Sequence, residues 1–201
     1  DVHALGLDLV SLSAHKLCGP KGVGALFVRA VNPRVRLDPL FFGGGHERGL
    51  RSGTLDVPGI VGFGAAAEIA RAEWEAEARR VAGLRDRLWE RLVSRVAGLS
   101  RNGHPALCHP GNLNVTIADT RADAVMAEAR DLAVSSGSAC TSLEAAPSHV
   151  LLALGKTRAE AEASIRFGLG RFTTEEEVDW AAAEVARAVA KARAERITAS
   201  A

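Results

Sequence analysis

Apolar positions recur with a helical period in the middle of the chain. Between Pro58 and about Val96 most of them fall three or four residues apart, at Ile69, Val81, Leu84, Leu88, Leu92 and Val96. This spacing places them on one face of an amphipathic helix. The opposite face carries the charged residues Arg79, Arg80, Arg87 and Glu90. Gly98 supplies a stop signal, so the pattern predicts one long helix over these residues.

Two short apolar segments before this helix have the character of buried strands. They cover residues 9–12 and 22–28, and Gly19 and Pro20 turn the chain between them. A glycine-rich polar loop then runs over residues 43–54. We expect the first strand to lie inside a core, which suggests that a segment precedes it in the protein.

The second half has a different rhythm. Leu113, Val115 and Ile117 alternate with Asn114 and Thr116, which is typical of a half-buried strand. Further strands are predicted at residues 133–135 and 165–169, and helices at residues 122–132, 147–154 and from 174 onward. Strands crossed by helices in this way predict an α+β unit for this half, within a chain whose fold class we expect to be α/β.

The first turns of two of these helices carry recognisable start signals. Pro147 stands near the first turn of the helix at 147–154, where proline is tolerated. Thr174 and Glu177 have the spacing of a capping box. The final helix then presents an apolar face formed by Val178, Ala182, Val185 and Val189.

Composition narrows the class of protein without naming a function. The 201 residues are 47% hydrophobic, enough for one large domain or two small ones. Twenty-five Lys and Arg residues against 24 Asp and Glu give a net charge of +1, so neither nucleic acid nor a membrane surface is an expected partner. The sequence has no apolar run long enough to predict a membrane span.

The three cysteines favour a reducing compartment. Cys18, Cys108 and Cys140 are odd in number and widely spaced, which argues against a disulfide scaffold. Free thiols fit the cytoplasm. The sequence contains no Cys-x-x-Cys pair, so we expect no zinc ribbon. His104 and His109 flank Cys108, but a polar loop is the better interpretation, and we expect no metal. We interpret Cys18 and Cys108 as structural residues.

Two segments of the first half suit the binding of a phosphorylated carbonyl compound. In Ser-Leu-Ser-Ala-His-Lys, Lys16 follows a strand directly, and lysine forms a Schiff base with carbonyl cofactors such as pyridoxal phosphate. Ser13 and His15 beside it are candidate phosphate donors. In the loop at 43–54, glycine N–H groups and two arginines suit an anion. The alternatives are a solvated lysine and a mobile surface loop.

A third segment, Ser-Ser-Gly-Ser-Ala-Cys-Thr-Ser over residues 135–142, places Cys140 among small and hydroxylated residues. Such a composition suits an exposed loop. The thiol is then available for chemistry.

Five motifs in order resemble the cysteine desulfurases, which belong to the class V aminotransferase superfamily of fold-type I pyridoxal phosphate enzymes. They are S-x-S-A-H-K-x-x-G-P-K-G-V-G-A-L, G-G-G-H-E-R-G-L-R-S-G-T, S-S-G-S-A-C-T-S, P-S-H-V-L-L-A-L-G and S-I-R-F-G-L-G-R-F-T-T-E-E-E-V-D. The similarity runs from the first residue to about Val185. The resemblance implies the C-terminal part of the large pyridoxal phosphate domain over residues 1–72, then a small α+β C-terminal domain over residues 73–201.

Motif positions imply a role for each site residue. Lys16 matches the lysine that binds the cofactor covalently, with Ser13 and His15 at phosphate-binding positions. Thr54 matches a residue that reaches the phosphate of the neighbouring subunit's cofactor. Cys140 matches the nucleophile that accepts sulfur. Arg166 matches the arginine that holds the substrate carboxylate, a task that suits a guanidinium fork; its alternative is a surface ion pair.

The implied reaction converts L-cysteine to L-alanine and leaves sulfur as a persulfide on Cys140. The resemblance further implies a homodimer that passes sulfur to an acceptor protein, either an iron–sulfur scaffold or a tRNA-thiolation carrier. The first motif stands where this family is about half complete, so several cofactor contacts have no counterpart here. A selenocysteine lyase, another class V aminotransferase or lyase, and a non-catalytic fragment that needs a separate N-terminal half remain as alternatives.

Overall fold

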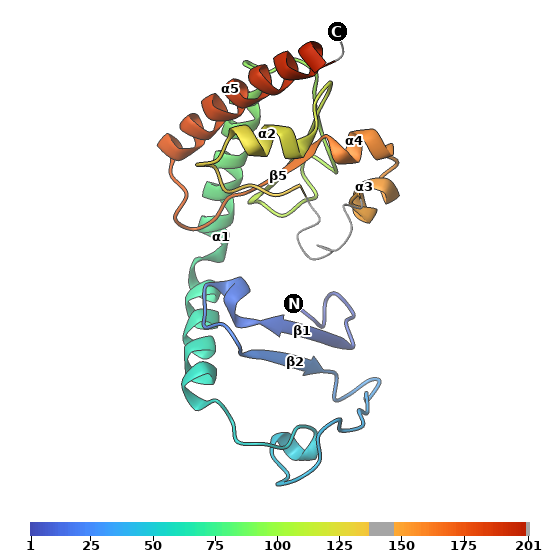
Figure 1. The fold of residues 1–201 in the computed structure, drawn as a ribbon. Coiled ribbons are helices and arrows are strands. Elements are labelled where there is room, and N and C mark those ends of the chain that lie inside the picture. The colour runs from blue at the N-terminus through green and yellow to red at the C-terminus, as the bar shows by residue number, and fades with distance from the viewer. Residues whose placement is uncertain (137–146, 200–201) are drawn as a thin grey trace. The chain divides into compact units, whose positions relative to one another are not determined.

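The chain folds into two compact units, residues 1–74 and 75–201, and helix α1 (Val57–Val93) contributes to both (Figure 1). The computed structural model describes residues 1–136 and 147–199. Helices and strands mix in both halves, as the sequence predicts. None of the helices in these ranges has a stretch long and apolar enough to cross a membrane.

The first unit is built on a two-stranded antiparallel sheet. Strand β1 (Leu9–Ser13) pairs with β2 (Gly24–Val28) from Leu9 opposite Val28 to Ser13 opposite Gly24. The short 3₁₀ helix η1 (Ala14–Leu17) follows β1, and η2 (Glu47–Gly49) lies in the loop before α1. Both predicted strands are therefore confirmed.

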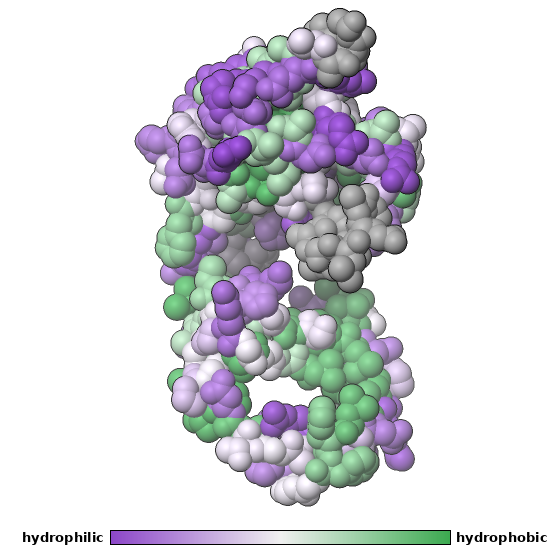
Figure 2. Space-filling view, viewed as in Figure 1, coloured by the Kyte–Doolittle hydropathy of each residue, from purple (hydrophilic) through white to green (hydrophobic). Residues whose placement is uncertain are grey.

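The predicted burial of the first strand is wrong for this chain. Leu9 and Leu12 are 46% and 48% exposed, and Ala14 is the one buried apolar side chain of residues 1–74. A two-stranded sheet covers too little surface to form a core. Hydrophobic residues accordingly occupy much of the visible surface of this unit (Figure 2).

Close packing nevertheless fixes part of this unit. A Cβ added at Gly62 of α1 would lie 2.6 Å from Cγ of Pro20, and one added at Gly19 would lie 3.1 Å from Cβ of Ala66. The segment after η1 therefore sits directly on the first turns of α1. Only glycine at these two positions permits so close an approach.

The second unit holds the hydrophobic core. Strands β3 (Leu99–Arg101), β4 (Asn112–Ile117) and β5 (Ser164–Gly168) form an antiparallel sheet in the order β3-β4-β5. One face is buried against α1, α2 (Ala122–Glu128) and α5 (Glu175–Ala199). Its core side chains include Leu113, Val115, Ile117, Ile165 and Phe167 from the sheet and Leu84, Leu88, Leu92, Val185 and Val189 from the helices.

Several element bounds differ from the sequence-based expectation. Helix α2 ends at Glu128 rather than at Leu132, and the predicted strand at 133–135 is a single bridge from Ser135 to Arg166. Helix α3 covers His149–Ala153. Strand β3 and helix α4 (Arg158–Glu162) were not predicted, although Thr157 and Glu160 form a capping box before α4.

The connection from β5 to α5 is held by hydrogen bonds at both of its ends. Arg80 donates hydrogen bonds to the carbonyl oxygens of Gly170, Arg171 and Thr173, and so fixes the link from β5 to α5. Thr174 and Glu177 form the predicted capping box at the start of α5, with bonds of 2.9 and 3.2 Å. The connection that follows β5 is therefore fixed on both sides.

A charge cluster joins α1 to α5. Arg87 contacts the Asp179 carboxylate at 3.0 Å through Nε and at 2.7 Å through Nη2, and Arg91 Nε lies 3.0 Å from the same group. Hydrogen bonds from Arg87 foremost, then from Arg91, lower the pKa of Asp179 from 3.8 to about 2. The carboxylate is therefore favoured in the folded state.

We predict that this cluster makes stability depend on acid pH. The folded-state pKa of Asp179 lies below its unfolded value, so its stabilising contribution is complete above about pH 4. That contribution is lost as the pH falls towards 2. Asp179→Asn should lower the midpoint of urea unfolding at pH 7, and the difference from the parent should vanish near pH 2. Asp119→Asn is the control, because Asp119 has no ion pair with another described residue. Equal pH profiles for Asp179→Asn and the parent would contradict the prediction.

We predict that Gly62 is needed to hold the segment after η1 and that Gly64 is not. An added methyl group at Gly62 meets Pro20, whereas a Cβ at Gly64 meets nothing within 4 Å. Gly62→Ala should speed hydrogen exchange at the Gly19 amide, which bonds to the Ala14 carbonyl at 2.9 Å. Gly64→Ala should leave this exchange unchanged and, through helix propensity, stabilise α1 by about 0.5–1 kcal/mol. The same exchange rate in both variants would refute the close packing.

Candidate functional site

Lys16 stands on one tight helical turn at the end of β1. The Ala14 amide donates to the Val23 carbonyl at 3.1 Å, and the Gly19 amide donates back to the Ala14 carbonyl. Cys18 ends the turn in the left-handed conformation, with φ 60°. The backbone on both sides of Lys16 is thus fixed while its side chain stays exposed. The turn presents a primary amine to solvent from a rigid support.

Two polar side chains accompany this amine. Ser13 Oγ lies 3.4 Å from Nδ1 of His15, and both residues are within three positions of Lys16. A hydroxyl and an imidazole beside an ammonium group suit a phosphorylated aldehyde, because they offer phosphate donors and a carbonyl-reactive amine together. Ser13 and His15 are therefore in contact with each other, and Lys16 is the next residue along the chain.

Thr54 lies at the end of the glycine-rich loop. Nη1 of Arg51 donates to the carbonyl oxygens of Gly53 at 3.0 Å and Thr54 at 3.5 Å, which bends the Arg-Ser-Gly-Thr segment back on itself. The Thr54 side chain is exposed and has no hydrogen bond to Ser13, His15 or Lys16. Its predicted role towards a neighbouring subunit stays a prediction.

Arg166 occupies the centre of β5 in the second unit. Its backbone pairs with Asn114 of β4 on one side and with Ser135 on the other, through N–H···O bonds of 2.7 and 3.2 Å to Ser135. Its side chain is exposed, on the face opposite Ile165 and Phe167. Cys140 lies outside the described residues. The chain leading to it is tied at Ser135 to the Arg166 backbone.

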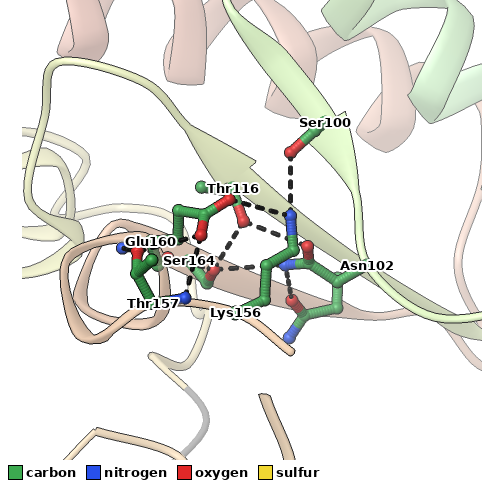
Figure 3. Close-up of polar contacts among 8 residues, drawn as sticks. Ser100, Asn102, Thr116, Lys156, Thr157, Glu160 and Ser164 are labelled. Carbon is green, nitrogen blue, oxygen red and sulfur yellow. Dashed lines mark hydrogen bonds and ion pairs between the residues drawn. The ribbon is translucent and has the colours of Figure 1, made fainter. Parts of the chain in front are cut away.

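A polar network underlies the face that carries Arg166 (Figure 3). Asn102 is its centre: Nδ2 donates to Oδ1 of Asn114 at 2.7 Å and to Oγ of Ser164 at 3.1 Å, and Oδ1 accepts from Thr116 at 3.0 Å. Ser164 in turn donates to the Glu160 carbonyl at 2.7 Å. Lys156 also contacts Ser100 and Glu160. The network therefore connects strands β3, β4 and β5 with helix α4.

This network was not recognised from the sequence. The signal was present in the alternation of Asn112, Asn114 and Thr116 with core residues, which predicted a polar face but not its use. Asn102 gave no signal, because it lies in a loop and reaches its partners only in the folded state.

Of the other two cysteines, Cys18 shares the η1 turn with Lys16 and Cys108 lies in the second unit. Cys18 is exposed at the end of the η1 turn. Cys108 is half-buried, with Sγ 3.3 Å from Arg85 Nη1 and 3.8 Å from Arg101 Nη2. Nδ1 of His104 accepts hydrogen bonds from the Ala106 amide at 3.0 Å and the Leu107 amide at 2.8 Å. Within residues 1–136 and 147–199 no three His, Cys, Asp or Glu side chains form a group suited to a metal ion.

Comparisons with known proteins bear on these groups. Cysteine desulfurase IscS of Anaeromyxobacter sp. (strain Fw109-5) is 58% identical over 193 residues, which are 96% of this chain and 48% of that protein. Cysteine desulfurase IscS of Azotobacter vinelandii (strain DJ / ATCC BAA-1303) is 53% identical over 193 residues, 96% of this chain and 47% of that protein. The chain thus spans about half the length of the curated relatives it matches.

Solved structures give the same picture of the fold. A structure titled NifS-like protein matches with a TM-score of 0.81 and 34% identity, over 94% of this chain and 48% of that chain. One titled SspA in complex with cysteine matches with a TM-score of 0.62 and 37% identity, over 87% and 47%. A family model described as aminotransferase class-V matches residues 1–180. These findings confirm the α/β fold and the resemblance drawn from the motifs: the chain belongs to the aminotransferase class-V family.

Proposed function

We propose that this chain carries the C-terminal half of a cysteine desulfurase, which removes sulfur from L-cysteine and releases L-alanine. The observation that carries the proposal is the 58% identity over 96% of the chain to a protein with that name. The rigid support of Lys16 and the tie between Ser135 and Arg166 agree with it.

Lys16, Ser13, His15 and Thr54 form the cofactor side of the proposed site. Pyridoxal phosphate, when bound, supplies an aldehyde and an electron sink for the amino acid's Cα. Lys16 would hold that aldehyde through its amine, and the same amine would move the proton at Cα. Ser13 and His15 would donate hydrogen bonds to the phosphate, and Thr54 would bind the phosphate of the cofactor in a second subunit of a homodimer.

Arg166 and Cys140 form the substrate side. The guanidinium of Arg166 binds the carboxylate of L-cysteine and orients its thiol group. The Cys140 thiolate attacks the substrate sulfur and a sulfur–sulfur bond forms. The carbon–sulfur bond breaks, its electron pair passes to the substrate carbon, and that carbon takes up a proton to become the methyl group of L-alanine. The sulfur stays on Cys140 as a persulfide. An acceptor protein then takes it, either an iron–sulfur scaffold or a tRNA-thiolation carrier.

The first unit is proposed to be part of a larger cofactor domain, with the sequence-based boundary at residue 72. Two findings support this assignment. Only one apolar side chain of residues 1–74 is buried, and the matched relatives are about twice as long as this chain. A folded domain of this size ordinarily buries far more. The missing contacts lead us to expect that the chain alone binds the cofactor weakly or not at all.

Other class V reactions use the same groups. A selenocysteine lyase would need Lys16 and Arg166 in the same roles, and competition between the two substrates separates it from a desulfurase. A plain aminotransferase gives Cys140 no role. A non-catalytic fragment that folds with a separate N-terminal half predicts stable association without turnover.

We predict that activity needs both halves and two residues of this chain. The chain should be produced with the N-terminal half of the Anaeromyxobacter relative, loaded with pyridoxal phosphate, and assayed for alanine released from L-cysteine. Lys16→Ala should abolish alanine release, a loss of at least about 100-fold by analogy with removed acid–base groups. Cys140→Ser should abolish persulfide formation, and Cys18→Ser should change neither signal.

Two outcomes would contradict the proposal. Turnover that survives Cys140→Ser would favour an aminotransferase. A stoichiometric, borohydride-reducible absorbance band in the chain alone, lost in Lys16→Ala, would refute the need for an N-terminal half.

A further inference from the structure

The sheet of the second unit is open along one side of β5. Strand β5 pairs with β4 on its other side, and on the open side Ser135 forms a single bridge to Arg166. The Leu169 amide donates to the Gly111 carbonyl at 2.8 Å. Because the N–H and C=O groups of successive residues alternate between the two sides of an antiparallel strand, those of Gly168 face away from β4. They lie on the same side as the backbone groups that meet Ser135.

The backbone groups next to this bridge have no protein partner in the part of the chain that the structure describes. Neither the N–H nor the C=O of Gly168 makes a hydrogen bond to a residue within 1–136 or 147–199, and the same holds for Ala133. Both residues are exposed. In a continued ladder they would stand opposite each other, two positions beyond the bridge. The ladder instead stops at Ser135, which leaves two unpaired segments.

Residues from both unpaired segments line one apolar groove. Residues 132–134 line it from one segment and residues 167–169 from the end of β5, and its other lining residues include Leu88, Val178, Trp180 and Ala181. Its volume is about 250 Å³. An apolar cavity of about 150 Å³ already accepts a benzene ring. Trp180 remains 47% exposed beside the groove. The groove is therefore large enough for a bulky apolar side chain.

An extended peptide would occupy both features at once. Its backbone N–H and C=O groups can pair with those of Gly168, as when exposed sheet edges bind peptides. Every second side chain of such a segment points to the face of the sheet that Phe167 and Leu169 also face, where the groove lies. A small apolar molecule would fill the groove but leave the backbone groups of Gly168 unpaired. The two features together favour a strand.

We propose that an extended segment of the N-terminal half of the protein adds a strand to β5 at Gly168 and inserts an apolar side chain into the groove. The inference rests on the proposed function, which gives this chain a separate N-terminal half. The 193 aligned residues are 48% of the Anaeromyxobacter relative, so about as many residues again lie outside the match. Helix α1 links the two units, so a half that covers the first unit is held at high effective concentration for the second.

Hydrogen exchange tests where this strand lies. The chain is produced alone and together with the N-terminal half of the Anaeromyxobacter relative. The Gly168 amide should exchange at least about tenfold more slowly in the joined halves, because a hydrogen bond to the added strand protects it. The amide of Gly103, which is exposed in the loop after β3, is the control and should exchange at the same rate in both samples.

Competition between variants tests the pairing itself. Gly168→Pro removes the outward N–H without breaking a bond to β4, and proline is tolerated at such edge positions. Gly168→Ala keeps the N–H, and its Cβ would meet nothing within 4 Å. Each variant competes with the parent chain for a limiting, tagged N-terminal half, and the purified complex is analysed by mass spectrometry. The proline variant should be recovered about fivefold less than the parent, as expected for one lost hydrogen bond, and the alanine variant equally well.

A second pair of variants tests the groove. Trp180→Glu places a charge beside the apolar side chain that enters the groove, and it should reduce recovery in the same competition at least about tenfold. Val93→Glu is the control, because Val93 is similarly exposed, at 50%, and does not line the groove. It should be recovered as well as the parent. If Gly168→Pro lowers the urea midpoint of the chain, the Trp180 pair decides.

Four results would overturn the proposal. They are an unprotected Gly168 amide in the joined halves, equal recovery within each matched pair of variants, halves that do not associate, and protection of Gly168 in the chain alone that rises with its concentration. In the last case a second copy of the chain is the occupant. Failure of the desulfurase assignment is distinguishable, since Gly168 would then be protected in joined halves that release no alanine from L-cysteine.

Discussion

The antiparallel pairing of β4 with β5 is the constraint on which the second unit depends. One register, from Asn112 opposite Gly168 to Thr116 opposite Ser164, puts the apolar side chains of both strands on the core face and the polar ones on the other face. A shift by one residue would exchange the two faces. The apolar side then could not meet α1 and α5, and Arg166 would point into the core. The fold and the substrate side of the proposed site are therefore specified by the same pairing.

Periodicity predicted the long helix, the main strands and the capping box of α5, because each depends on residues close together in the sequence. The residues Val81, Leu84, Leu88 and Leu92 are buried as their spacing indicates. The motifs likewise identified the family. Burial of β1 was predicted wrongly, since an apolar run shows only that a strand needs a cover and not whether this chain supplies it.

The polar network shows why the rest of the site was beyond sequence reasoning. Asn102, Asn114 and Ser164 are up to 62 positions apart and come together only when β3, β4 and β5 associate. An isolated asparagine in a loop has no periodic signal. Helix α4 is a different case, because Thr157 and Glu160 carried a readable capping signal that the five-residue length of the helix obscured.

The position of Asn102 in the sequence also affects its chemical stability. It is followed by Gly103, which is exposed and has a positive φ of 82°. An asparagine before glycine loses its side-chain amide more readily than in other contexts, because no side chain hinders attack by the next backbone nitrogen. Loss of that nitrogen would set a carboxylate against Oδ1 of Asn114, where a donor now stands. The hydrogen bond that joins the loop after β3 to β4 thus depends on a side-chain amide that is prone to deamidation.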